Sequence, residues 1–237
     1  MPSSTRLSPC LWFDSEAEEA ADFYTAAFPG ARRVGEAHYP ESFDNPSGKP
    51  RGSVMTADFE IAGTRFTALN GGPMFEINPT ISFFVHVEAA ETARSLAEAL
   101  SDGGQYLMPL GEYPWSPQYA WVEDRFGVSW QILAVEGATL EIVPCLMFAG
   151  DVHGQAEDAL RHYAGIFPAA EIEVVDHYSS DEGPPGTLKH GRADLGRGRL
   201  VTMDSHLEHE ARFNEAVSLQ VICSDQAEVD RFWRILG

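Results

Sequence analysis

The sequence predicts an α+β fold assembled from paired βαβββ modules, with the second pair incomplete. Two observations predict it. Short apolar runs of strand length alternate with amphipathic helical segments in the first half of the chain. The same order of patterns begins again about 135 residues later, which indicates an internal duplication. We therefore expect a complete domain at residues 1–137 and a second, C-terminally incomplete domain at residues 138–237.

Matching residue patterns support the duplication. The matches keep their order along the chain, and the spacing between them changes only by the length of a loop, so chance explains them poorly. The matched pairs are Pro9–Phe13 with Pro144–Phe148, Phe23–Pro29 with His162–Pro168, and Asn78–Ser82 with Asn214–Ser218.

The first module begins with the apolar run Leu7–Phe13, which has strand character. The acidic, alanine-rich segment Glu16–Phe28 places its apolar residues at helical spacing. Asp14 and Ser15 are the expected caps of this helix, and Pro29 is expected to end it. The three strands expected next are Val34–Tyr39, Ser53–Ile61 and Arg65–Leu69.

The second module repeats this order. Ile81–Val87 is an apolar strand, and Ala90–Leu100 has the pattern of an amphipathic helix. The strands expected after this helix are Tyr106–Leu110, Tyr119–Glu123 and Ser129–Val135.

The second copy stops early. It reaches the strand Ser218–Cys223 and the helix Asp225–Leu236, and the three strands that follow in the first copy have no counterpart. Such a sheet has an open edge and an uncovered core. Three explanations are a truncated sequence, loss of the tail in evolution, and cover by a partner chain. We favour a truncated sequence.

Charge excludes two classes of partner. The chain has 16 Lys and Arg against 36 Asp and Glu, a formal net charge of −20. A field this negative repels phosphate backbones and anionic lipid headgroups, so we expect no nucleic-acid or membrane partner. Three cysteines without a CxxC spacing and an N-terminus without an apolar core indicate a cytoplasmic protein.

Several segments carry a family resemblance. The most specific is Tyr119–Ile132, and it is joined by Phe13–Asp14 and Phe23–Tyr24 around the first helix and by Phe213–Ser218 in the second copy. With these segments the chain resembles the vicinal oxygen chelate superfamily, which includes glyoxalase I and the bleomycin-resistance proteins. Within it, the chain is similar to the PhnB-like, or 3-demethylubiquinone-9 3-methyltransferase-like, group. The resemblance implies tandem glyoxalase-like domains.

The resemblance also implies where a metal would bind. Metal-dependent members hold their ligands on the first, fourth, fifth and eighth strands. The matching positions here are Ser8–Cys10, Thr67 or Ala68, Ser82, and Gln131. Serine, threonine and glutamine are poor ligands for a divalent metal, and one thiolate does not make a site. We therefore expect neither a metal nor another cofactor.

An apolar pocket for a flat ligand is the expected site. Strand alternation places Phe84 and His86 on the face where relatives bind metal. For His86, a structural histidine is a slightly better interpretation than a catalytic one, and no residue is assigned a catalytic role. The expected ligand-binding residues are Trp12, Asn70, Phe84, His86, Trp115 and Gln131.

Other polar residues have plainer interpretations. Asp204, His206 and His209 lie in a dense His and carboxylate run at metal-clip spacing, but a solvated loop explains them more simply. His38 and His177 occupy equivalent places in the two copies. An acid/base pair is one interpretation, and hydrogen-bonded strand histidines are the preferred one.

The sequence favours a metal-independent small-molecule binding protein that forms a homodimer. A metal-dependent lyase, isomerase or oxygenase of the superfamily is the first alternative, so enzyme activity stays an open question. A quinone methyltransferase, as the family name implies, is the second. No strand is followed by the glycine-rich loop that S-adenosylmethionine sites use, which counts against the second alternative.

Overall fold

The computed structural model describes residues 7–42, 45, 47–196 and 198–236. The first module consists of β1 (Leu7–Phe13), α1 (Ala17–Ala27), β2 (Arg32–His38), β3 (Val54–Ile61) and β4 (Thr64–Asn70). The second consists of β5 (Ile81–Val87), α2 (Ala90–Leu100), β6 (Gln105–Tyr113), β7 (Ser116–Glu123) and β8 (Ser129–Ala134). The predicted α+β modules are confirmed.

The second copy repeats the order. Its first module consists of β9 (Glu141–Phe148), a short 3-10 turn η1 (Gly150–Val152), α3 (Ala156–Ile166), β10 (Glu171–His177), β11 (Leu188–Asp194) and β12 (Arg199–Asp204). It is followed by β13 (Val217–Val221) and α4 (Gln226–Leu236). No helix in the described part of the chain is long and apolar enough to cross a membrane.

Two sheets form, and each draws strands from both sides of residue 137. The larger has eight strands in the order β10-β11-β12-β9-β5-β8-β7-β6, and the smaller has five in the order β13-β1-β4-β3-β2. Antiparallel pairs join the modules, β5 with β9 in the larger sheet and β1 with β13 in the smaller. The division into domains at residue 137 stays a prediction.

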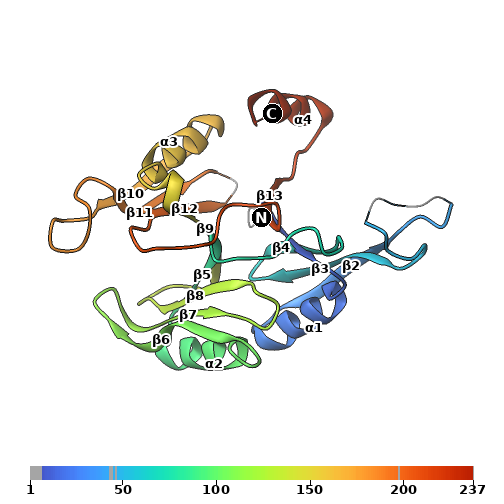
Figure 1. Cartoon of the computed structure of the whole chain (residues 1–237), viewed down its shortest axis with the longest axis horizontal. Coiled ribbons are helices and arrows are strands. Elements are labelled where there is room, and N and C mark those ends of the chain that lie inside the picture. Colours follow the sequence, from blue (N-terminus) through green and yellow to red (C-terminus); the bar gives the residue numbers. More distant parts are fainter. Residues whose placement is uncertain (1–6, 43–44, 46, 197, 237) are drawn as a thin grey trace.

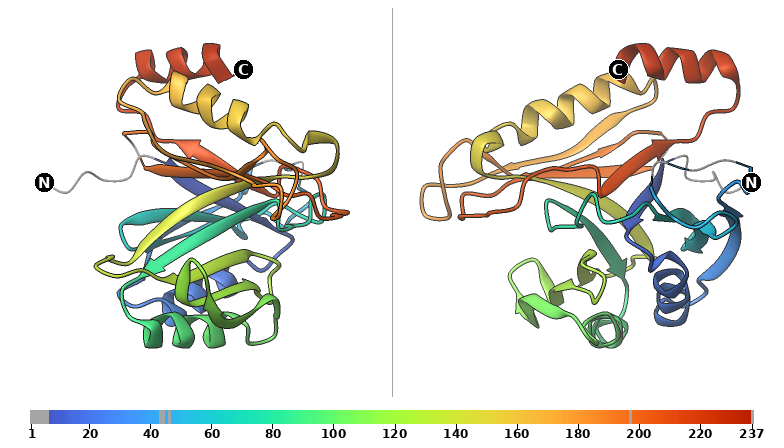
Figure 2. Two further views of the ribbon diagram at one scale, coloured as in Figure 1. Left: turned by 90° about the vertical axis from the view of Figure 1, so that its left-hand side faces the viewer. Right: turned by 45° about the vertical axis from the view of Figure 1, so that its right-hand side comes forward.

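The helices lie outside the sheets. Helices α3 and α4 cover one side of the molecule, and α1 and α2 cover the opposite side (Figure 2). Figure 1 shows α3 beside β10–β12 and α2 beside β6–β8, at the two ends of the larger sheet. The face of this sheet turned away from α2 and α3 therefore lies between the helix layers, and we call it the inner face.

One predicted detail is wrong. Asp14 and Ser15 do not cap α1, because the helix begins after Glu16 and has no side-chain cap on its N-cap residue. The backbone N–H of Ala17 instead donates to the Asn70 side chain on β4, at 2.9 Å. The tertiary contact with Asn70 thus caps the N-terminus of α1, where the sequence predicted a local cap.

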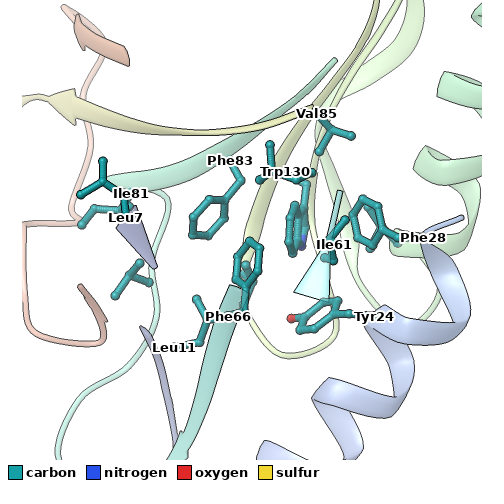
Figure 3. Close-up of a cluster of buried hydrophobic side chains, with 14 of the residues drawn as sticks. Leu7, Leu11, Tyr24, Phe28, Ile61, Phe66, Ile81, Phe83, Val85 and Trp130 are labelled. Carbon is teal, nitrogen blue, oxygen red and sulfur yellow. The ribbon is translucent and has the colours of Figure 1, made fainter. Parts of the chain in front are cut away.

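Aromatic side chains join the two sheets in the core. The Trp130 ring on β8 lies 5.4 Å from Tyr24 of α1 and 5.2 Å from Phe83 of β5 (Figure 3). Phe66 of β4 contacts the same cluster, 5.4 Å from Phe83. All four side chains are fully buried. The cluster therefore connects α1 and the smaller sheet to the larger sheet.

A buried carboxylate, that of Asp124, forms hydrogen bonds with two side chains of this aromatic cluster. Asp124 Oδ2 accepts hydrogen bonds from the Tyr24 hydroxyl and from Trp130 Nε1, both at 2.8 Å. Its Oδ1 accepts from the backbone N–H groups of Phe126 and Val128. Burial raises the pKa of Asp124 to about 6, although these four hydrogen bonds favour the ionised form.

Candidate functional site

Strand alternation decides which side chains reach the inner face. On β5, Phe83 and Val85 join the helix-side core, so Ser82, Phe84 and His86 lie on the inner face. Strand β8 pairs with β5 in parallel and aligns its own inner-face residues with these. The predicted residues Phe84, His86 and Gln131 are thereby brought to one surface.

A chain of hydrogen bonds crosses the middle of this surface. The Tyr119 hydroxyl donates to Gln131 Oε1 at 2.8 Å, and Gln131 Nε2 donates to Ser82 Oγ at 2.9 Å. Across the β5–β9 pair, Ser82 stands opposite Cys145. Both ends of the Gln131 amide are therefore fixed, so the side chain has a defined orientation.

The same groups are electrically neutral. Burial raises the pKa of the Cys145 thiol to about 12, and burial also raises the pKa of Tyr119 above its ordinary value. At neutral pH both side chains keep their protons. The centre of the inner face is thus a neutral, hydrogen-bonding surface.

Apolar side chains surround this chain. Phe84, Leu133, Val143 and Val201 are buried around it. An outer layer of half-buried side chains packs against them and consists of Met108, Tyr113, Trp121 and Met203. This outer layer is the part that a bound molecule would contact.

An aromatic cluster stands at the tip of the β6–β7 hairpin. Trp115 lies 5.1 Å from the Tyr113 ring and 5.5 Å from the Tyr119 ring, and it is 53% exposed. Because Tyr119 also bonds to Gln131, the hairpin tip is connected directly to the polar chain. Trp115 therefore lies exposed next to one end of the polar chain.

Charged groups close the other end of the inner face. His86 Nδ1 lies 3.5 Å from Glu141 Oε2, and the guanidinium of Arg199 donates to Glu141 at 2.7 Å. Arg199 also lies 3.3 Å from Glu173. The contact with His86, followed by the Arg199 charge, lowers the pKa of Glu141. This end of the inner face therefore carries charged side chains of both signs that are paired with one another.

Sequence reasoning missed His190. This β11 residue lies 5.8 Å from the Phe84 ring, and burial lowers its pKa to about 4. It is therefore a neutral imidazole at pH 7 and can donate or accept a hydrogen bond. The alternation of His190 and Arg192 along β11 was the available signal, since it places both on one face.

Trp12 and Asn70 lie in the smaller sheet and are not brought to this surface. Asn70 Oδ1 accepts from Ala17, and its Nδ2 donates to Glu18 and to the Val54 carbonyl, so its hydrogen bonds hold the fold together. Trp12 Nε1 donates to the Gly72 carbonyl at 2.7 Å. Their role in ligand binding stays a prediction.

The positions that the resemblance implied for a metal do not fit one. Ser82 and Gln131 meet Cys145 of β9, whereas Cys10 and Thr67 face each other in the smaller sheet. A protonated thiol, a hydroxyl and an amide offer a divalent cation no charge. No group of three potential metal-ligating side chains is found among the described residues.

The remaining histidine and aspartate candidates have structural partners. Asp204 Oδ1 accepts from the Gly154 N–H at 2.7 Å, and its Oδ2 accepts from the Leu188 N–H at 2.8 Å. His38 contacts Glu36 at 3.2 Å, and His177 contacts Glu157 at 2.6 Å. The interpretation of His38 and His177 as hydrogen-bonded strand histidines is confirmed.

The chain resembles several proteins of known structure. Glyoxalase I of Zea mays has a TM-score of 0.52 at 12% identity, over 83% of this chain and 67% of its own, which shows a shared fold. The PhnB protein of Bacillus cereus is 34% identical over 54% of this chain and 98% of its own, with a TM-score of 0.48. A Pseudomonas aeruginosa protein is 26% identical over 54% and 95%, with a TM-score of 0.44.

A family model covers almost the whole chain. It is described as 3-demethylubiquinone-9 3-methyltransferase, and it matches twice, over residues 5–133 and 140–237. No curated protein matches the chain. By the family match and the shared fold, the chain belongs to the 3-demethylubiquinone-9 3-methyltransferase family, the PhnB-like group of the vicinal oxygen chelate fold.

Proposed function

We propose that the inner face of the larger sheet binds a small, flat organic molecule without a metal. One observation carries the proposal. Ser82 and Gln131, two positions where the resemblance implies metal ligands, are joined with Tyr119 in one chain of hydrogen bonds whose groups are all neutral. Such a surface can orient a polar group of a ligand, and it offers no charge to hold a cation.

The surroundings suit a ligand with an apolar body. Tyr113, Trp115 and Trp121 offer partly exposed rings, and Met108 is a flexible neighbour that can repack around a guest. Neutral His190 supplies a further hydrogen-bonding group at the edge of this layer. The class of ligand proposed is therefore an aromatic or heteroaromatic molecule with one polar substituent.

Binding of anilinonaphthalene sulfonate, an aromatic probe that carries a sulfonate and an anilino N–H, tests the site. We expect probe fluorescence to report binding to the wild-type protein and the dissociation constant to rise at least about fivefold in Trp115→Ala and His86→Ala, a loss near 1 kcal/mol. His38→Ala on the outer surface is the matched control. Equal binding by all variants would place the site elsewhere.

Metal independence has its own test. Elemental analysis of protein purified without chelator should find far less than one transition metal ion per chain. One metal per chain would contradict the proposal and favour the lyase, isomerase or oxygenase alternative. Reconstitution with Zn²⁺, Mn²⁺ and Fe²⁺ followed by the same analysis excludes loss during purification.

The methyltransferase named in the family description is the second candidate function. The family description favours it, and the PhnB protein of Bacillus cereus carries the same methyltransferase name. Calorimetric titration with S-adenosylmethionine separates the two proposals. Heat of binding at one site per chain would support a methyltransferase, and no heat together with binding of the aromatic probe would support a binding protein.

We further propose that two copies of the chain associate through α4. Val229, Trp233 and Leu236 form a stripe at helical spacing and are 44%, 77% and 48% exposed. The adjacent strand β13 is the edge of its sheet. Sedimentation equilibrium should show a dimer for the wild type and a monomer for Trp233→Ser. A wild-type monomer at micromolar concentration contradicts the proposal.

A cytoplasmic location also stays a proposal. The three cysteines are free in the structure, and free thiols are typical of a reducing compartment. Fractionation of cells with an antibody against the chain tests it.

A further inference from the structure

The loop after β12 borders a hollow that the inner face does not include. Its volume is about 800 Å³, and its lining includes His153, Ser205, His206, His209 and Arg212. His206 and His209 were considered in the sequence as metal ligands, and a solvated loop was the simpler interpretation. Since Asp204 is committed to backbone N–H groups, they need a different explanation.

A serine and a histidine meet in this hollow. Ser205 Oγ lies 2.8 Å from His209 Nε2. Burial lowers the pKa of His209 below the ordinary value, so the ring is neutral at neutral pH. In the tautomer that carries the ring proton on Nδ1, Nε2 accepts a hydrogen bond from the serine hydroxyl. This is the contact by which a base activates a hydroxyl nucleophile.

Both residues are held in place by other contacts. The backbone N–H of Ser205 donates to the Phe148 carbonyl at 2.8 Å, which fixes the serine at the end of β12. Arg212 Nη1 donates to the His209 carbonyl at 2.8 Å and to the Ala211 carbonyl at 3.1 Å. These hydrogen bonds hold Arg212 against the loop backbone at His209 and Ala211.

Two groups that can stabilise negative charge border the same hollow. Arg212 brings a permanent positive charge, and a Cβ at Gly150 would come within 2.9 Å of its guanidinium, so glycine leaves room for it there. His153 Nδ1 is a buried ring nitrogen without a hydrogen-bond partner among the described residues. A buried orphan nitrogen is unfavourable unless a ligand or water completes it.

From this geometry we propose that Ser205 and His209 hydrolyse small carboxylic esters. Ser205 Oγ forms a bond to the ester carbonyl carbon while His209 Nε2 takes the hydroxyl proton. The bond from that carbon to the alkoxy oxygen then breaks, and His209 gives the proton to the leaving alcohol. A water molecule, deprotonated by His209, then attacks the acyl carbon, the bond from that carbon to Ser205 Oγ breaks, and His209 returns the proton to Ser205 Oγ as the acid is released. Arg212 and His153 are the groups available to the oxyanion.

Covalent labelling of the full chain tests the nucleophile directly. A fluorophosphonate probe should label the wild-type protein, with loss of fluoride, and peptide mapping by mass spectrometry should place the phosphonyl group on Ser205. Label on another residue, or no label, overturns the proposal. This measurement needs no variant, so it decides the question even if substitutions at Ser205 disturb folding.

Hydrolysis of p-nitrophenyl acetate tests the pair. We expect Ser205→Ala and His209→Ala to lower the initial rate at least about tenfold. Ser101→Ala, which removes a hydroxyl elsewhere on the chain, is the control for the serine, and His38→Ala, which removes an exposed histidine outside the hollow, is the control for the histidine. Thermal melting confirms that each variant is folded. An unchanged rate in folded Ser205→Ala overturns the proposal.

Discussion

The two sheets contain the same pair of strands in different surroundings. In the larger sheet β9 pairs with β5 and Cys145 stands opposite Ser82, while in the smaller sheet β1 pairs with β13 and Cys10 stands opposite Ser218. Only β5 is flanked by a further strand, β8, on its other side. Ser82 is consequently buried, and Ser218 is exposed.

The helices show the same difference. In α2, Ala93, Leu96, Ala97 and Leu100 are all buried, with β7 and β8 beneath them. The residues at the equivalent positions of α4 are Val229, Phe232, Trp233 and Leu236, and of these only Phe232 is buried. The elements present in both copies thus have the same arrangement in each half. The strands β6–β8 add the neighbours that bury Ser82 and the apolar side of α2, and they carry Tyr119 and Gln131 of the polar chain.

The largest effect is expected from removing the Trp130 side chain, which joins the two sheets. We expect Trp130→Ala to lower the free energy of unfolding by about 3–5 kcal/mol, because it empties the space between Tyr24, Phe66 and Phe83. Urea denaturation followed by circular dichroism measures this. Exposed Trp115→Ala is the control, and an equal loss in both variants would contradict the role given to Trp130.

The second largest effect concerns pH and Asp124. Its pKa is about 6 in the folded chain against 3.8 ordinarily, so the folded state binds the proton more tightly. Stability contributed by this group therefore rises as pH falls from about 7 to about 4, by roughly 2 kcal/mol. Above pH 6 the buried charge carries its full desolvation cost.

Comparison with Asp124→Asn isolates this contribution, since the variant has no proton to bind at that site. Glu141, Glu157 and Glu182 have lowered pKa values and act in the opposite direction, but equally in both proteins. Urea denaturation at pH 5.0 and pH 7.0 should show a larger gain on acidification for the wild type than for the variant. Equal pH dependence would mean that Asp124 titrates in its ordinary range.

A matched pair of serines sharpens the comparison between the sheets. Ser82→Ala should cost about 1–2 kcal/mol, because it leaves the buried Gln131 amide without an acceptor. Ser218→Ala, at the repeat-related and exposed position, should stay within about 0.5 kcal/mol. Thermal denaturation of the two variants side by side gives the difference in stability, and equal losses would contradict the different environments of the two serines.

The smallest expected effect concerns the reactivity of two cysteines and involves no change in the free energy of unfolding. Cys145 is buried and Cys10 half-buried, and burial raises the pKa of both thiols. Iodoacetamide should therefore alkylate Cys10 slowly and leave Cys145 unmodified in the folded chain. Mass spectrometry of peptides after timed quenching measures both rates. Faster reaction at Cys145 would contradict the closed surface of the larger sheet.

The sequence predicted the bounds of individual strands and helices well, but it did not predict which strands pair with one another. Ile81–Val87 and Ala90–Leu100 have the predicted bounds, because apolar periodicity is a local property. The pairing of β5 with β9 leaves no trace in either strand, since alternation shows which face is buried and not which strand lies alongside.

Contacts between distant residues explain why some of the predicted residues lie away from the inner face. Asn70 lies in the smaller sheet, and its partner Ala17 is 53 positions away in sequence, where no local pattern connects them. His190 has no histidine at the matching place in the first copy, so comparison of the repeats passed over it. Gln131 and Phe84 were found because strand alternation alone decides their face.

The pairing of β1 with β13 has a consequence for biosynthesis. Leu7 stands opposite Val221, so β1 stays without this neighbour until β13, far along the chain, has been synthesised. Among the described residues the larger sheet uses no strand beyond β12, so its strands are all synthesised ahead of β13. A nascent chain can therefore pair these strands of the larger sheet first, and one edge of β1 stays open until β13 has been made.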